Sequence, residues 1–112
     1  MLSENGINKI NLLHDLLKQF WGSNIQLLDT RVLEAPFDMF EIKVLLYKSV
    51  EVLLGYERSI IAISIKTKDG FVNLRKLTKE ETIKGFKSSE KDSILHNFKV
   101  LDKTLRAMDL TK

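Results

Sequence analysis

Hydrophobic residues near the start of the chain recur at the spacing of an α-helix. Between positions 8 and 21 they stand three or four residues apart, and Gly22 follows where a left-handed residue commonly ends a helix. The stripe consists of Ile10, Leu13, Leu17 and Phe20, widened by Leu12, Leu16 and Trp21. This pattern predicts an amphipathic helix over residues 8–21.

The middle of the chain favours strands. Residues 25–33 are rich in branched aliphatic side chains, and Pro36 places a loop or a strand edge after them. Residues 40–46 and 50–54 alternate apolar and polar side chains with a period of two. The alternation breaks near Lys48, which fits either one long strand with a bulge or two strands joined by a tight turn.

The dipeptide Asp69-Gly70 is the strongest hairpin signal in the sequence. A two-residue loop there pairs Lys66 with Asn73 and Ile65 with Leu74. The flanking aliphatic residues then share one face, namely Ile61, Ile63, Ile65, Val72 and Leu74. We therefore predict a hairpin whose second strand extends to Arg75.

Two helices are predicted after this hairpin. The segment from Thr78 to Glu81 matches a capping box and indicates a short helix to about residue 86. Ser89 offers the N-cap of a longer helix, on which Asp102 and Arg106 stand one turn apart as an ion pair. Its apolar stripe recurs every three or four residues at Ile94, Phe98, Leu101, Leu105 and Met108.

These elements predict one α+β domain over residues 1–112. It comprises an N-terminal helix, an antiparallel sheet of four to five strands, a short helix and a long C-terminal helix packed on the sheet. A chain of 112 residues buries enough surface to fold without a disulfide or a metal. No internal repeat or linker divides it.

The composition excludes several classes of chemistry. The chain has no cysteine, so thiol catalysis, disulfides and cysteine-ligated zinc are ruled out and a reducing compartment is favoured. The amino terminus lacks the basic and apolar regions of a secretory signal, and no apolar run approaches the roughly 20 residues that span a bilayer. We expect a cytoplasmic protein without a membrane segment.

No catalytic, cofactor or metal site is evident. His14 and His96 have no partner at metal-ligand spacing, and the five glycines are too scattered to form a phosphate-binding loop. Four carboxylates cluster around the proline loop, at Asp29, Glu34, Asp38 and Glu41, but their spacing matches no calcium loop. A solvated acidic loop is favoured over a metal or acid–base site, and we expect no enzyme.

Charge is distributed unevenly along the chain. Residues 1–57 carry 5 basic and 8 acidic residues, a net of −3, whereas residues 58–112 carry 13 and 7, a net of +6. The basic half includes cations and an aromatic ring that suit phosphate neutralisation and base stacking. The candidate nucleic-acid surface comprises Lys66, Lys68, Phe71, Arg75, Lys76 and Lys79.

The stripe on the last helix, Ile94 to Met108, has two interpretations. It either packs on the sheet as the lid of a monomeric core or forms a seam with a second subunit or partner. Any sheet surface that the helices leave open offers a further apolar face, with Leu45, Tyr47, Leu53 and Ile60 as its candidates.

The leading hypothesis is a non-enzymatic, self-associating interaction module, in its simplest form a homodimer. It is motivated by aliphatic residues on both faces of the predicted strands and by the absence of a catalytic motif. Nucleic-acid binding through the basic hairpin at residues 64–76 is the alternative, and a small enzyme is the third. No motif in the sequence identifies a family.

Overall fold

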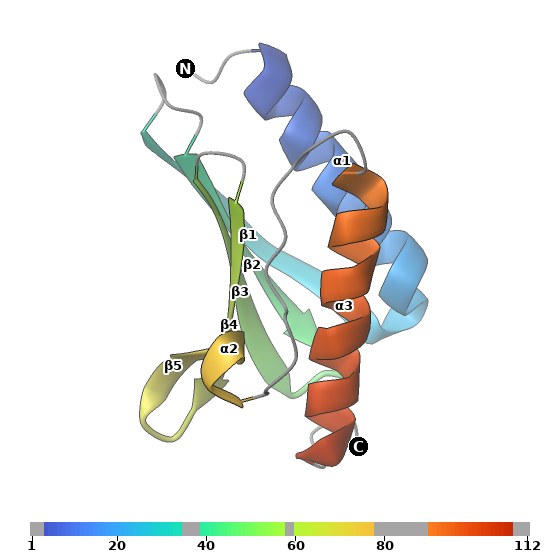
Figure 1. Cartoon of the computed structure of the whole chain (residues 1–112), viewed down its shortest axis with the longest axis vertical. Coiled ribbons are helices and arrows are strands. Elements are labelled where there is room, and N and C mark those ends of the chain that lie inside the picture. The colour runs from blue at the N-terminus through green and yellow to red at the C-terminus, as the bar shows by residue number, and fades with distance from the viewer. Residues whose placement is uncertain (1–3, 35–38, 58–59, 78–89, 109–112) are drawn as a thin grey trace.

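Two long helices lie on one face of a five-stranded antiparallel sheet (Figure 1). The structure, a computed structural model, describes residues 4–34, 39–57, 60–77 and 90–108. The strands follow one another in the sheet in chain order. The elements are α1 (Glu4–Trp21), a 3₁₀ turn (Gly22–Asn24), β1 (Ile25–Glu34), β2 (Met39–Leu46), β3 (Val50–Glu57), β4 (Ile60–Thr67), β5 (Gly70–Asn73), α2 (Leu74–Leu77) and α3 (Glu90–Ala107). The predicted α+β class is confirmed.

The core follows from the period-two alternation of the strands. Along β2 every second side chain is buried, and the same alternation is found along β3 and β4. The buried positions on this inner face are Phe40, Ile42, Val44, Leu46, Val50, Val52, Leu54, Tyr56, Ile61, Ile63 and Ile65. Covering an aliphatic face of this extent removes it from water, which is favourable, and the helices provide the cover.

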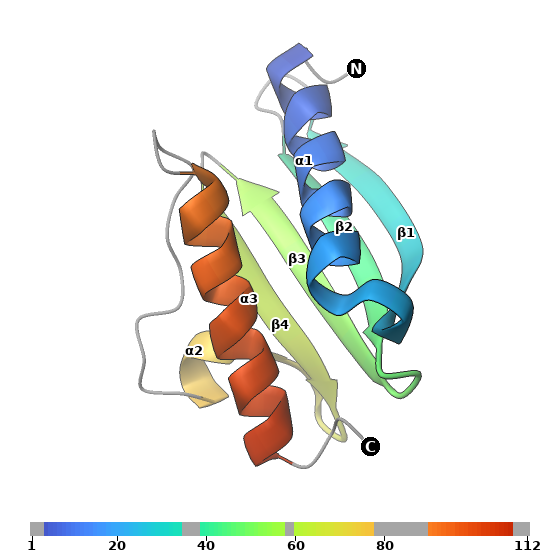
Figure 2. The ribbon, with the colours of Figure 1, turned by 90° about the vertical axis from the view of Figure 1, so that its right-hand side faces the viewer.

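Both helices pack their predicted stripes against this inner face, except for Met108, which is exposed. In Figure 2, α1 lies over β1 and β2 while α3 lies over β4. Three aromatic rings close the space between the helices: the Trp21 ring lies 4.5 Å from that of Phe20 and 5.0 Å from that of Phe98, centroid to centroid. Edge-to-face and tilted contacts at these distances stabilise a core beyond the area they bury.

A polar junction at Asp102 joins three separate elements. Its carboxylate accepts hydrogen bonds from Trp21 Nε1 at 3.1 Å, from the Tyr47 hydroxyl, and from Arg106 Nε at 2.9 Å. The predicted pair between Asp102 and Arg106 is therefore confirmed. The junction links the end of α1 and the β2–β3 turn to α3.

The turn between β2 and β3 resolves the ambiguity near Lys48: two strands are joined by a tight turn. Tyr47 and Lys48 have φ of 53° and 61°, and the Ser49 N–H donates to the Leu46 carbonyl at 3.1 Å. Left-handed backbone costs roughly 1–2 kcal/mol per non-glycine residue. The Tyr47 N–H donates to the Asn24 carbonyl at 2.7 Å, which helps to offset this cost.

This turn also corrects the expected position of Tyr47. The alternation placed Tyr47 on the open sheet face, whereas its ring packs against the core and its hydroxyl reaches Asp102. The positive φ interrupts the strand alternation and redirects the side chain.

The hairpin after β4 has a different register from the predicted one. Lys66 pairs with Phe71 and Ile65 with Val72, so each partner lies two residues earlier than expected while the faces stay the same. The expected loop needs a positive φ at Asp69, but only Gly70 adopts one here, at 101°. The Thr67 hydroxyl stabilises the observed turn by accepting from the Asp69 N–H and donating to the Gly70 carbonyl.

The end of the second hairpin strand is also corrected. β5 stops at Asn73, and Leu74 is buried in the one-turn helix α2 instead of continuing the strand to Arg75. The helix predicted from Thr78 to residue 86 and the N-cap at Ser89 lie outside the described residues.

Because of the Asp102 junction, the stability of the fold decreases at acid pH. Burial alone raises the pKa of Asp102, but hydrogen bonds from Tyr47, Arg106 and Trp21 outweigh it and hold the pKa below its usual value. The ionised carboxylate therefore stabilises the fold fully above the unfolded pKa of about 3.9, and this contribution is lost as pH falls through the folded pKa.

We predict that Asp102→Asn lowers the free energy of unfolding by about 2 kcal/mol at neutral pH, because charge-assisted hydrogen bonds are lost. The difference from the unsubstituted chain should shrink below about pH 4, where Asp102 becomes protonated. Urea unfolding followed by Trp21 fluorescence measures both effects. Asp15→Asn, at an exposed site on α1, is the matched control and should change little; a deficit independent of pH would contradict the prediction.

Candidate functional site

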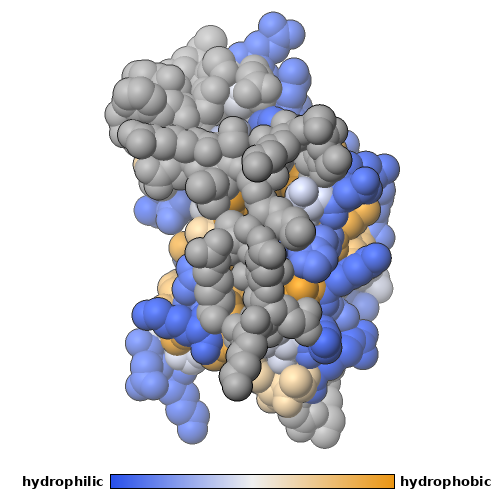
Figure 3. Space-filling view, in the orientation of Figure 1, coloured by the Kyte–Doolittle hydropathy of each residue, from blue (hydrophilic) through white to orange (hydrophobic). Residues whose placement is uncertain are grey.

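The face of the sheet opposite α1 and α3 is not covered by any described element (Figure 1). We call it the outer face. Hydrophilic and apolar surface interleave on the described parts of the molecule seen in Figure 3. The described residues on the outer face are Gln26, Asp29, Arg31, Met39, Glu41, Lys43, Leu45, Glu51, Leu53, Gly55, Ala62, Ser64, Lys66, Phe71 and Asn73.

Strand register arranges the centre of the outer face into two neighbouring rows. The first row crosses the sheet through Arg31, Glu41, Gly55 and Ala62. The second crosses it through Asp29, Lys43, Leu53 and Ser64. On β1 and β2 the four charges therefore alternate in sign both along and across the strands, which is the favourable arrangement for cross-strand pairs.

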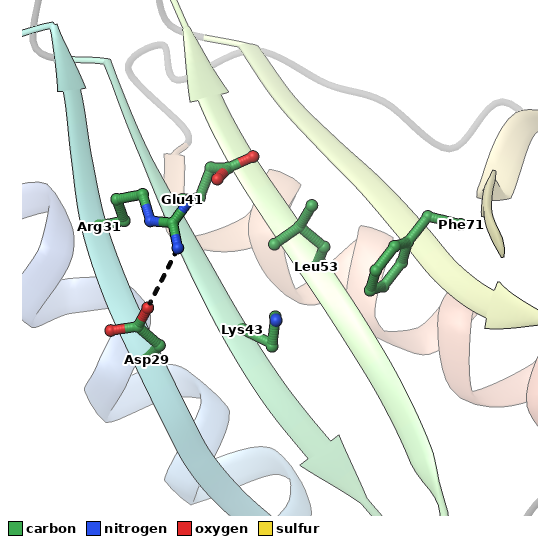
Figure 4. A pocket seen from close by; sticks show the side chains of 6 residues that line it. All are labelled: Asp29, Arg31, Glu41, Lys43, Leu53 and Phe71. Atoms are coloured by element: carbon green, nitrogen blue, oxygen red, sulfur yellow. Dashed lines mark ion pairs between the residues drawn. The ribbon is translucent and has the colours of Figure 1, made fainter.

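A shallow hollow of about 130 Å³ lies over these rows (Figure 4). It is lined by Asp29, Arg31, Glu41, Lys43, Leu53 and Phe71. The Arg31 guanidinium lies 4.0 Å from the Asp29 carboxylate, and their side chains are 68% and 57% exposed. An exposed pair of this kind adds little to stability, so both groups can form new contacts at small cost.

Apolar side chains flank the charges on the same face. Leu45 and Leu53 are half-buried among their neighbours, and Phe71 is 42% exposed. The outer face therefore combines apolar and charged side chains, whereas the sequence suggested an apolar face wherever the helices leave the sheet open. The side chain of Ile60, another candidate for this face, is not among those described.

The predicted nucleic-acid residues are only partly brought together. Lys66 and Phe71 are cross-strand neighbours on the outer face, Lys68 is exposed at the hairpin tip, and Lys76 is exposed on α2. The side chain of Arg75 and the whole of Lys79 lie outside the described part of the chain.

The sequence pattern did not identify Glu51 as an ion-pair partner of Lys66 in this basic group. Its carboxylate lies 3.2 Å from Lys66 Nζ. With it, the described side chains of the outer face include three acidic and three basic ones, namely Asp29, Glu41, Glu51, Arg31, Lys43 and Lys66. The pair between Lys66 and Glu51 follows from the register of β3 against β4, which spacing in the sequence does not give.

The predicted interface stripe of the last helix lies mainly inside the molecule. Ile94, Phe98, Leu101 and Leu105 are each at most 1% exposed, and only Met108 reaches the surface, at 38%. These four side chains fill the space over the sheet, as the lid interpretation requires. In this packing they are not accessible to a partner.

The candidate catalytic groups do not converge. His14 Nε2 lies 3.0 Å from the Thr30 hydroxyl, and burial, with the nearby charge of Lys18, lowers its pKa. Asp29 and Glu41 each face a basic residue across the strand pair, while the side chain of Glu34 and all of Asp38 are not described. Within the described ranges no three His, Cys, Asp or Glu side chains are grouped to hold a metal ion.

A second hollow, of about 270 Å³, lies beside the 3₁₀ turn. It is lined by Ser23, Asn24, Ile25, Gln26, Leu45 and Lys48. Lys48 is the one charged residue in this lining, so the hollow contains no acid–base pair for catalysis.

Comparisons with known proteins leave the function to be argued from this geometry. The chain matches no protein-family model, no curated protein and no solved structure. In the part of the chain that the structure describes, no helix is long and apolar enough to cross a membrane.

Proposed function

We propose that this protein is a non-enzymatic, self-associating interaction module that binds through its outer face. One observation carries the proposal: both long helices pack on the inner face, and the opposite face keeps Leu53 and Phe71 at the surface among balanced charges. An apolar centre with polar surroundings is the usual composition of a protein interface.

The edges of the sheet are poorer binding surfaces than this face. β5 is only four residues long, and β1 is interrupted by register shifts between Leu27 and Asp29 and between Val32 and Glu34. Short edge strands and bulges are common devices against the addition of a further strand. A partner is therefore expected to pack on the outer face and not to extend the sheet.

Nucleic-acid binding is the second candidate. The exposed ring of Phe71 with the exposed cations Lys68 and Lys76 favours it. The charges of the outer face oppose nucleic-acid binding, because among its described side chains three acidic ones offset three basic ones and a polyanion gains no net attraction. The protein-interaction proposal accounts for both the apolar and the acidic residues.

We predict that the purified chain self-associates as its concentration rises, and that Leu53→Lys weakens this association at least about tenfold. The substitution places a charge at the centre of the face, where desolvation opposes binding. Sedimentation velocity over a concentration series measures the association. Lys99→Glu, at an exposed site on α3, is the control and should leave it unchanged.

Thermal unfolding of the same variants separates association from folding. Because Leu53 points away from the core, Leu53→Lys should unfold near the temperature of the unsubstituted chain at dilute concentration. A chain that stays monomeric at every concentration would contradict the proposal.

For the second candidate, we expect no retarded band when the chain is mixed with single-stranded DNA or RNA at low salt. The expectation follows from the balanced charge of the outer face. A band that disappears with added salt and weakens in Lys66→Glu plus Arg75→Glu would establish nucleic-acid binding in its place.

A further inference from the structure

We propose that the partner on the outer face is a second copy of this chain, related by a two-fold axis that runs across the strands between the two central rows. This inference rests on the proposed function and adds its geometry. Such an axis stacks the two outer faces on each other. Each residue of one row then lies opposite the residue of the other row that belongs to the same strand of the second copy. Both charge and size then match.

Charge matches at β1 and β2. Arg31 of one copy faces Asp29 of the other, and Glu41 faces Lys43, so the symmetric contact forms four opposite-charge pairs in all. Arg31 and Asp29 are exposed in the single chain, whereas Glu41 and Lys43 are half-buried. All four lie toward the β1 edge of the face. Charges near the rim of an interface mainly set register and salt dependence.

Size matches at β3. The same axis places Leu53 of one copy over Gly55 of the other. A Cβ on Gly55 would meet only the Ala62 carbonyl oxygen, at 3.9 Å, which is ordinary contact, so packing within the chain does not require glycine there. Glycine inside a strand weakens it and often marks a site where another backbone or side chain approaches.

Other two-fold axes fit less well. An axis along the strands between β1 and β2 also opposes the charges, but it removes Leu53 from contact with Gly55. A diagonal axis through Arg31 and Lys43 brings Asp29 against Glu41, which are like charges. The axis across the strands is the arrangement that satisfies charge and size together.

The area of the face predicts a weak dimer. Five strands spaced about 4.8 Å apart and about 20 Å long cover roughly 500 Å². Stable interfaces bury about 800 Å² on each partner. We therefore expect a dimer that dissociates on dilution and weakens as salt screens the four ion pairs.

The first experiment substitutes the glycine. Gly55→Thr should raise the unfolding temperature of the dilute chain, because a β-branched residue suits a strand. The same change should weaken self-association about tenfold or more, since the side chain fills the space that Leu53 of the second copy occupies. Ala62→Thr is the matched control in the same row on β4, away from Leu53, and should weaken association less.

The second experiment inverts the four charges with Asp29→Arg, Arg31→Asp, Glu41→Lys and Lys43→Glu. Cross-strand pairs within each chain stay opposite in sign, so the inverted chain should fold and self-associate like the original. A mixed pair would oppose like charges at all four positions. Sedimentation of a fluorescent original chain with excess unlabelled inverted chain should show at least tenfold weaker association than with unlabelled original chain.

The outcomes separate this geometry from the proposed function. If the original and inverted chains associate with each other as well as with themselves, and Gly55→Thr still dimerises, this two-fold contact is wrong while self-association stands. If the original chain never associates, both proposals fail. Opposite effects of Gly55→Thr on stability and association, together with weak mixed pairing, support the contact.

Discussion

The aliphatic inner face of β2, β3 and β4 is the constraint on which the rest of the structure depends. Its alternate side chains are almost fully buried, and two amphipathic helices at opposite ends of the chain are needed to cover them. The apolar stripes of both helices, apart from Met108, are packed in this contact. Because both helices pack on one side, the opposite face of the sheet stays uncovered by the described elements and is the surface that we propose for binding (Figure 1).

The helices are placed on this face by interactions at the end of the sheet. Asp102 binds Trp21 from α1 and Tyr47 from the β2–β3 turn, and the backbone N–H of Tyr47 is held by Asn24. A left-handed tyrosine is unfavourable by itself and persists where surrounding contacts fix it. The same residues thus close the turn and connect the two helices, and none of them belongs to the outer face.

Periodicity predicted the helices, the strand faces and the open positions of Leu45 and Leu53, because burial enforces a period of two or 3.6. It did not predict the turns. At Tyr47 the conformation depends on Asn24 and Asp102, which are distant in sequence, and at Asp69 a threonine hydroxyl selected a turn other than the expected one. The candidate site depends on pairing between strands, so the Lys66–Glu51 pair and the two central rows could not be read from spacing alone.

We propose the outer face as the binding surface of the protein, and its main features are the balanced charges of its described side chains, Leu53 and the open Gly55. Backbone amide chemical shifts in a dilution series test this claim most directly. We expect concentration-dependent shifts to gather on β1, β2 and β3 around Arg31, Lys43 and Gly55, with α3 unchanged. Shifts confined to α1 or α3, or none at any concentration, would contradict the account.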